Sequence, residues 1–438
     1  MIKNQLQILF VANLLFYLFL PNISNAQSPD SHFENAEAFQ QGFSGLVVKD
    51  LETDEIVYER LGDKYFTPAS NVKLLTFYAG LKILEDSVPG LKYWTNNDSL
   101  IFTGTGDPSF LNPELPQSDI LAFLKNRKEK LFYLPASKIE KHYGPGWAWD
   151  DYNSSYSPER SDFPIYGNLV SFGAVSSRRV PVVYPRVFQD SIVLKNFYGQ
   201  RSGIERDLYK NYFTYYYVPV LPRQSASRLP FRYSPELLVK LLSDVVEKEI
   251  KILNTLPPKA GEPQIKMSVP TDSLYKRMLQ DSDNFIAEQI LLLSSNKLKN
   301  TFDADIAIDH ILKKTLKDLP DKIYWVDGSG LSRYNLMTPR SMVALLDKIA
   351  DEVETERLFH LLATYGKTGT IRNYYHARQP YIFAKTGTLL HNHSMSGYLK
   401  SKSGKILAFS FMNSNFVVPT REIKREMEKI LRDIYNRY

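Results

Sequence analysis

Residues 68–84 read PASNVKLLTFYAGLKIL, and this stretch decides the fold. Apolar residues lie on all sides of the helix predicted over 71–84, which indicates a helix buried in a core. Lys73 follows Ser70 by three positions, so the amine and the hydroxyl share one face of the helix. Burial would lower the pKa of Lys73, and a neutral amine beside a hydroxyl is a general base beside a nucleophile.

Alone, this pattern is weak evidence for catalysis. Ser-x-x-Lys also occurs at Ser273–Lys276 and Ser294–Lys297. The simpler alternative is that Ser70 caps the helix and that Lys73 extends its amine to water.

A second candidate, Ser282-Asp283-Asn284, precedes a helix predicted over 284–296. Its simplest interpretation is a helix cap, with Glu288 close enough to act as a supporting capping residue.

The third candidate, Lys385-Thr386-Gly387-Thr388, lies inside a strand predicted over 381–390. Gly387 would let a ligand approach the backbone closely, while the lysine and the hydroxyl groups could hold a carboxylate. A second copy, Lys367-Thr368-Gly369-Thr370, follows a helix predicted over 356–365 and has no strand pattern around it. We therefore reject the Lys367 copy as the catalytic one.

Composition excludes several classes of protein. The chain has 438 residues, is 43% hydrophobic and contains no cysteine, which excludes a disordered chain, a disulfide scaffold, a thiol nucleophile and a thiolate metal site. The formal net charge is +6 and no run of five like charges occurs, so we expect no nucleic-acid partner. The close histidine pair, His391 and His393, is expected to lie on the surface or in a loop, and we expect no metal and no cofactor.

The N-terminus is typical of an export signal. Lys3 precedes an apolar run over 8–20, and Ser24-Asn25-Ala26 resembles a cleavage site. The run is shorter than the roughly 20 residues that span a bilayer. We expect cleavage after residue 26 and a periplasmic or other extracytoplasmic protein without a membrane span; an uncleaved anchor is the alternative.

The order of predicted elements indicates an α+β fold. A hairpin over 45–58 and three strands over 381–390, 395–401 and 406–413 enclose most of the helices, which predicts one antiparallel sheet built from both chain ends and flanked by helices. Further helices are predicted after Ser234 and over 270–280, 303–317, 338–351 and 420–436. Residues 89–267 are rich in turn signals and are predicted to form an inserted, mostly β region. The predicted domains are thus a signal over 1–26, a discontinuous domain of 27–88 plus 268–438, and the insert.

In combination and in this order, the motifs at Ser70, Ser282 and Lys385 resemble those of the penicillin-recognising serine enzymes, with their β-lactamase/transpeptidase-like fold. The long interval between Lys73 and Ser282 narrows the resemblance to the D-alanyl-D-alanine carboxypeptidase/endopeptidases of the penicillin-binding protein 4 type, peptidase family S13. Four further segments are similar to that family: 104–109, 146–151, 327–332 and 396–398. The insert is compact, which leaves open whether the smallest nested domain of the family is complete.

The resemblance implies acyl transfer on peptidoglycan stem peptides, with β-lactams as covalent inhibitors. Ser70 would be the nucleophile and Lys73 its base, while Ser282 would relay a proton to the leaving amine. Asn284 would hold Lys73 and the substrate amide. The implied carboxylate-binding group is Lys385 with Thr386, Gly387 and Thr388, and the implied oxyanion hole is formed by the main-chain N–H groups of Ser70 and Thr388.

Two alternatives stay open on the sequence alone. The same site could serve a β-lactamase or esterase, or the chain could be a catalytically silent cell-wall-binding homologue. The balance between carboxypeptidase and endopeptidase activity also stays open, because both reactions break the same kind of bond.

Overall fold

The structure is a computed structural model that describes residues 29–136, 141–173, 181–196, 203–218, 227–257, 261–374 and 379–438. The predicted signal over 1–26 lies outside the described residues. Across these ranges, no helix combines the length and the apolar character that crossing a membrane requires.

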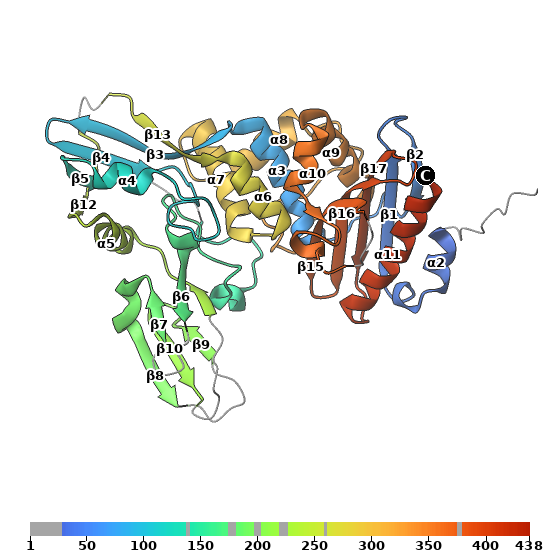
Figure 1. Cartoon of the computed structure of the whole chain (residues 1–438), viewed down its shortest axis with the longest axis horizontal. Coiled ribbons are helices and arrows are strands. Elements are labelled where there is room, and N and C mark those ends of the chain that lie inside the picture. The colour runs from blue at the N-terminus through green and yellow to red at the C-terminus, as the bar shows by residue number, and fades with distance from the viewer. Residues whose placement is uncertain are drawn as a thin grey trace, which may run out of the picture.

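A six-stranded antiparallel sheet joins the two ends of the chain (Figure 1). Strand β1 (Phe43–Asp50) pairs with a strand on each side, and its successive residues point to opposite faces: Leu46 and Val48 belong to one apolar cluster and Val47 to another. The predicted α+β fold with a sheet built from both chain ends is therefore confirmed. The strand order is β14 (Ala363–Thr364), β15 (Ile382–Leu389), β16 (Asn392–Lys400), β17 (Ile406–Ser414), β1 (Phe43–Asp50), β2 (Ile56–Arg60).

Helices cover both faces of this sheet. On one face, α11 (Thr420–Arg437) packs together with α2 (Pro29–Asn35), and on the other α9 (Pro339–Glu352) contacts β1 and β17. Beyond α9 lies an all-helical core around α3 (Val72–Ile83), which is buried on nearly all sides, as its apolar pattern predicts. The other helices of this part of the chain are α6 (Thr271–Gln280), α7 (Asn284–Lys299), α8 (Ala304–Lys314) and α10 (Thr355–Leu361).

Within its described residues, the region predicted as an insert is mostly β and contains three sheets. The five-stranded sheet has the order β12 (Ile250–Ile252), β5 (Lys130–Tyr133), β4 (Ser99–Gly104), β3 (Ser87–Asn96), β13 (Gln264–Pro270). Two three-stranded sheets extend away from it (Figure 1). The first has the order β11 (Ser227–Pro230), β6 (Leu169–Gly173), β7 (Val182–Tyr184). The second has the order β8 (Ile192–Asn196), β10 (Phe213–Tyr217), β9 (Gly203–Arg206). Two helices accompany these sheets, α4 (Ile120–Lys125) and α5 (Pro235–Val246). The predicted boundaries at 89 and 267 fall inside β3 and β13, and the division into domains stays a prediction.

Short 3-10 helices complete the described elements: η1 (Glu37–Phe39), η2 (Ala69–Asn71), η3 (Trp149–Asn153), η4 (Tyr166–Asn168), η5 (Arg186–Ser191) and η6 (Gly369–Ile371).

Some of the predicted ends of helices and strands were wrong. Helix α10 ends at Leu361 because Ala363 and Thr364 pair with β15, and β16 begins at Asn392, three residues before the predicted start.

Candidate active site

Ser70 lies in η2, the tight turn that leads into α3. Its neighbour Ala69 has a φ of 50°, a left-handed conformation that is uncommon for a residue with a side chain. Two glycines pack against this turn: a Cβ on Gly387 would lie 2.8 Å from the Ser70 nitrogen, and one on Gly330 would lie 2.0 Å from the Ala69 oxygen. Strand β15 and the loop containing Gly330 can therefore approach Ser70 only because both positions lack a side chain.

Lys73 is completely buried beside Ser70. Its Nζ donates to Ser70 Oγ at 3.0 Å, to Asn284 Oδ1 at 2.6 Å and to the Ser329 carbonyl at 2.6 Å. Burial lowers the pKa of Lys73 to about 8, although the carboxylate of Asp327 opposes this shift. The alternative in which Lys73 reaches water is therefore wrong. In the other two Ser-x-x-Lys patterns, the lysines contact His360 and Glu85 instead.

The Ser282 and Lys385 motifs meet at the same place. Lys385, also completely buried, donates from Nζ to Ser282 Oγ at 2.9 Å and to the Thr386 carbonyl at 2.6 Å. Burial, together with the Lys73 ammonium, holds the pKa of Lys385 well below its usual value. The cap interpretation is also correct for one residue, because the Asp283 carboxylate accepts from the Ile286 N–H at 3.0 Å and caps α7.

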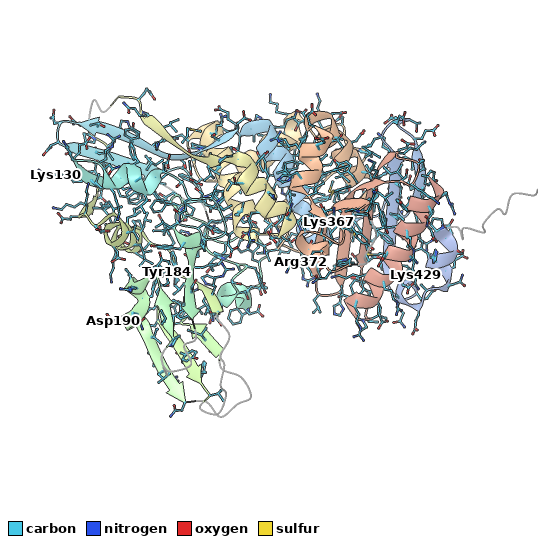
Figure 2. All side chains as sticks on the ribbon, viewed as in Figure 1. Lys130, Tyr184, Asp190, Lys367, Arg372 and Lys429 are labelled. Carbon is cyan, nitrogen blue, oxygen red and sulfur yellow. The ribbon has the colours of Figure 1, made fainter. Side chains whose placement is uncertain are left out.

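The hydroxyl groups of the Lys385 motif have different partners. Thr386 Oγ1 donates to Thr370 Oγ1 at 2.7 Å, whereas Thr388 is exposed and lies 2.8 Å from Nδ1 of His393. Lys367, of the rejected copy, is exposed on the surface (Figure 2). That copy nevertheless brings Thr370 to the candidate site, a contact that the sequence did not predict.

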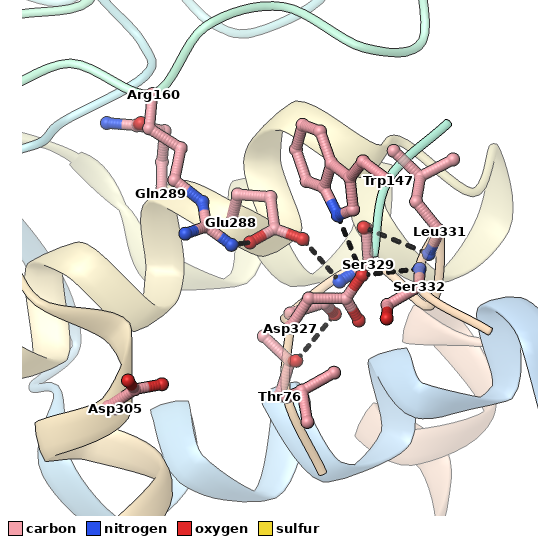
Figure 3. A network of polar contacts seen from close by, with 12 residues as sticks. Thr76, Trp147, Arg160, Glu288, Gln289, Asp305, Asp327, Ser329, Leu331 and Ser332 are labelled. Carbon is pink, nitrogen blue, oxygen red and sulfur yellow. Dashed lines mark hydrogen bonds and ion pairs between the residues drawn. The ribbon is translucent and has the colours of Figure 1, made fainter. Parts of the chain in front are cut away.

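Behind Lys73 lies a buried polar network centred on Asp327 (Figure 3). The Asp327 carboxylate accepts from the N–H groups of Gly330 at 2.9 Å and Ser332 at 2.7 Å, and from Nε1 of Trp147 at 2.9 Å. Burial and the negative charge of Glu288 raise the pKa of Asp327. These bonds fix the loop whose Ser329 carbonyl accepts from Lys73.

Glu288 extends this network into the insert region. Its carboxylate accepts from the Ser329 N–H at 2.8 Å and forms an ion pair with Arg160, whose guanidinium lies 5.3 Å from the centre of the Trp147 ring. The prediction that Glu288 supports the cap of α7 was wrong, because its carboxylate is engaged in these buried contacts. Sequence reasoning missed Arg160, since no local pattern marks a residue whose partner lies in a distant helix.

The two histidines after β15 differ in their surroundings. His391 is exposed in the turn, as expected, with a φ of 64°. The prediction for His393 was wrong: it lies within β16 and its side chain is completely buried. In the described part of the chain, no three His, Cys, Asp or Glu residues are grouped as a metal site.

Comparison with known proteins identifies the family of this chain. The sequence profile of the D-Ala-D-Ala carboxypeptidase 3 (S13) family matches residues 26–181 and 232–434, and the chain belongs to that family. It is 25% identical over 463 aligned positions to the D-alanyl-D-alanine carboxypeptidase DacB of Haemophilus influenzae, with 95% of each chain covered.

Solved structures share the fold. The crystal structure of penicillin binding protein 4 from Haemophilus influenzae aligns with a TM-score of 0.76 at 18% identity, covering 94% of this chain and 99% of that one. A predatory endopeptidase from Bdellovibrio bacteriovorus aligns with a TM-score of 0.52 at 15% identity, covering 88% of this chain and 92% of that one. At these identities the structural likeness establishes the fold alone.

Proposed function

We propose that the protein is a serine-type D-Ala-D-Ala carboxypeptidase and DD-endopeptidase that acts on peptidoglycan stem peptides through an acyl-enzyme on Ser70. One observation carries this proposal: Ser70, Asn284 and the Ser329 carbonyl all contact the buried amine of Lys73. Membership of the S13 family and the name of the Haemophilus influenzae relative support the same activity.

The first half-reaction forms the ester. Ser70 Oγ attacks the carbonyl carbon of a D-Ala–D-Xaa bond while its proton moves to the neutral amine of Lys73. The carbonyl oxygen becomes an oxyanion, for which the main-chain N–H groups of Ser70 and Thr388 would be the donors. Ser282 then relays to the leaving nitrogen the proton that Lys73 accepted, so that Lys73 is neutral again, and the C–N bond breaks. Water hydrolyses the ester in the second half-reaction and regenerates Ser70.

Strand β15 would bind the C-terminal end of the substrate. Lys385 and the hydroxyl groups of Thr386 and Thr388 would bind the terminal carboxylate, while Gly387 allows the strand to lie against the Ser70 turn. A bound carboxylate would favour the charged form of Lys385, offsetting the effect of burial on its pKa. Asn284 would hold the Lys73 amine and the substrate amide.

Labelling with a fluorescent penicillin tests the nucleophile. A β-lactam presents a similar acyl group and carboxylate, and its opened ring should remain on Ser70. We expect a labelled band for the wild type and none for Ser70→Ala; an unlabelled wild type would contradict the proposal. Slow decay of the adduct in single turnover distinguishes this enzyme from a β-lactamase, which would release it quickly.

Product analysis tests the substrate. Digestion of purified muropeptides should release D-Ala from pentapeptides, cleave D-Ala cross-links, or do both, and Ser70→Ala should do neither. Binding to cell walls that survives in Ser70→Ala, together with an inactive wild type, would indicate a silent wall-binding homologue instead.

We also propose that the protein acts outside the cytoplasm, in the periplasm, after removal of the predicted signal over 1–26. The proposal rests on the sequence of that segment and on a substrate found in the cell wall. Cell fractionation and the N-terminal sequence of the mature protein test it: an N-terminus at Met1 or a cytoplasmic location would overturn it.

A further inference from the structure

A buried imidazole lies beneath the part of β15 that would bind the substrate. His393 on β16 pairs in register with Thr388 on β15, and its Nδ1 lies 2.8 Å from Thr388 Oγ1. The ring of His393 is completely buried, whereas Thr388 is exposed. This contact therefore connects the interior of the sheet to a hydroxyl group on the surface of the candidate site.

The ring of His393 is electrically neutral in the folded protein. Burial and the nearby ammonium group of Lys424 lower the pKa of His393 to about 3, although an interaction with the backbone of Gly387 opposes this shift. A neutral imidazole carries one proton, on either Nδ1 or Nε2. The position of that proton decides whether the ring donates to Thr388 or accepts from it.

The surroundings of the ring favour a proton on Nδ1. Nε2 is buried and has no hydrogen-bond partner among the described residues. A buried N–H without an acceptor is rarer in proteins than a buried acceptor without a donor. The tautomer with an N–H at Nδ1 leaves only a lone pair unsatisfied at Nε2, and Nδ1–H then donates to Thr388 Oγ1.

We propose that His393 is a positioning residue that occupies one lone pair of the Thr388 hydroxyl and so leaves its proton free for the terminal carboxylate of the substrate. In the other tautomer, Nδ1 would accept a hydrogen bond from the Thr388 hydroxyl. The hydroxyl would then turn an oxygen lone pair toward the substrate carboxylate. The inference rests on the proposed function, because it concerns recognition of the same carboxylate.

The experiment compares His393→Leu, His393→Asn and Thr388→Val with the wild type. The side-chain amide of asparagine can place an N–H where Nδ1 lies, whereas leucine offers no donor. With a peptide ending in D-Ala-D-Ala, we expect His393→Leu to lower kcat/KM about tenfold, mostly through KM, which corresponds to about 1.4 kcal/mol. His393→Asn should recover most of this loss.

Two further measurements separate positioning from a general structural role. The loss in His393→Leu should be smaller for a peptide with a C-terminal amide, which carries no charge, and should vanish in the Thr388→Val background because the two residues act as a unit. Nitrogen-15 spectra of the wild-type histidines, assigned with His393→Asn, should show the proton on Nδ1; this holds even if His393→Leu does not fold.

Three results would overturn the inference: a proton on Nε2, equal losses for the carboxylate and amide peptides, or unchanged kcat/KM in a folded His393→Leu. Each of them leaves the proposed function intact when the wild type is labelled by penicillin. An unlabelled and inactive wild type would instead contradict the proposed function itself.

Discussion

Arg160 and Glu288 form an ion pair in which both side chains are almost completely buried, with exposed fractions of 4% and 1%. Arg160 belongs to the region predicted as an insert, and Glu288 to α7. Glu288 also accepts from the N–H of Ser329, whose carbonyl accepts from Lys73. The pair therefore connects the insert region to the amine that we propose as the general base, through one intervening residue.

Arg160→Met should raise the pH at which the enzyme becomes active. Without the guanidinium, the Glu288 carboxylate is unpaired and stabilises the charged form of Lys73 more strongly, so its pKa rises. Loss of one partner of a buried pair should also lower the free energy of unfolding by about 3–5 kcal/mol. The acylation rate against pH and denaturant unfolding measure the two effects.

The matched control for this prediction is Arg160→Met combined with Glu288→Gln. The amide oxygen can still accept from Ser329 without a charge, so the pH profile should return toward that of the wild type. If the acylation rate of Arg160→Met depends on pH in the same way as that of the wild type, the ion pair does not act on Lys73.

Acylation by penicillin should increase with pH, reach half of its maximal rate near pH 8 and level off only above that value. Lys73 must lose its proton to act as a base, and burial lowers its pKa to about 8, so the active fraction increases as pH rises through that value. Lys73→Ala should lower the acylation rate at least about 10²-fold. Full labelling of that variant, or a wild-type rate independent of pH across this range, would remove Lys73 from the role.

The two Lys-Thr-Gly-Thr copies provide an internal control. Lys385→Ala removes the buried amine that would pair with the substrate carboxylate and should lower kcat/KM by up to about 10²-fold, as expected for a charge-assisted hydrogen bond. Lys367→Ala removes an exposed charge outside the site and should leave kcat/KM within about twofold. Steady-state kinetics on one D-Ala-D-Ala peptide tests both variants, and the reverse ranking would mean that the wrong copy was chosen.

Gly387→Ala should abolish penicillin labelling. The added methyl group would lie 2.6 Å from the Pro68 oxygen and 2.8 Å from the Ser70 nitrogen, so β15 must move away from the nucleophile. Gly203→Ala is the matched control, because nothing lies within 4 Å of its added methyl group. Normal labelling of Gly387→Ala would show that the close approach of β15 is not needed for acylation.

Local patterns predicted the elements that carry the candidate site. The apolar positions around Lys73 predicted a buried helix, and helical periodicity placed its amine one turn from Ser70 because that distance depends only on backbone geometry. The strand pattern around Lys385 likewise distinguished it from Lys367. His393 was misplaced because β16 begins earlier than predicted, at a polar residue that gives no strand signal.

Contacts between distant segments could not be predicted in the same way. Glu288 has the spacing of a capping residue, and nothing near it in the sequence indicates a partner at Arg160. The contact of Thr370 with Thr386 could not be predicted either, because the copy of the motif that contains Thr370 is not in a strand and no local pattern places it beside β15.

By itself, the sequence determined the chemical groups, their order along the chain and the helix or strand that carries each one, because these depend on nearest neighbours and on backbone periodicity. The tertiary structure decided which of these groups touch and which of them are charged. Burial and Coulomb interactions act between segments that only folding brings together, so the protonation of Lys73, Lys385 and His393 is a property of the packed molecule.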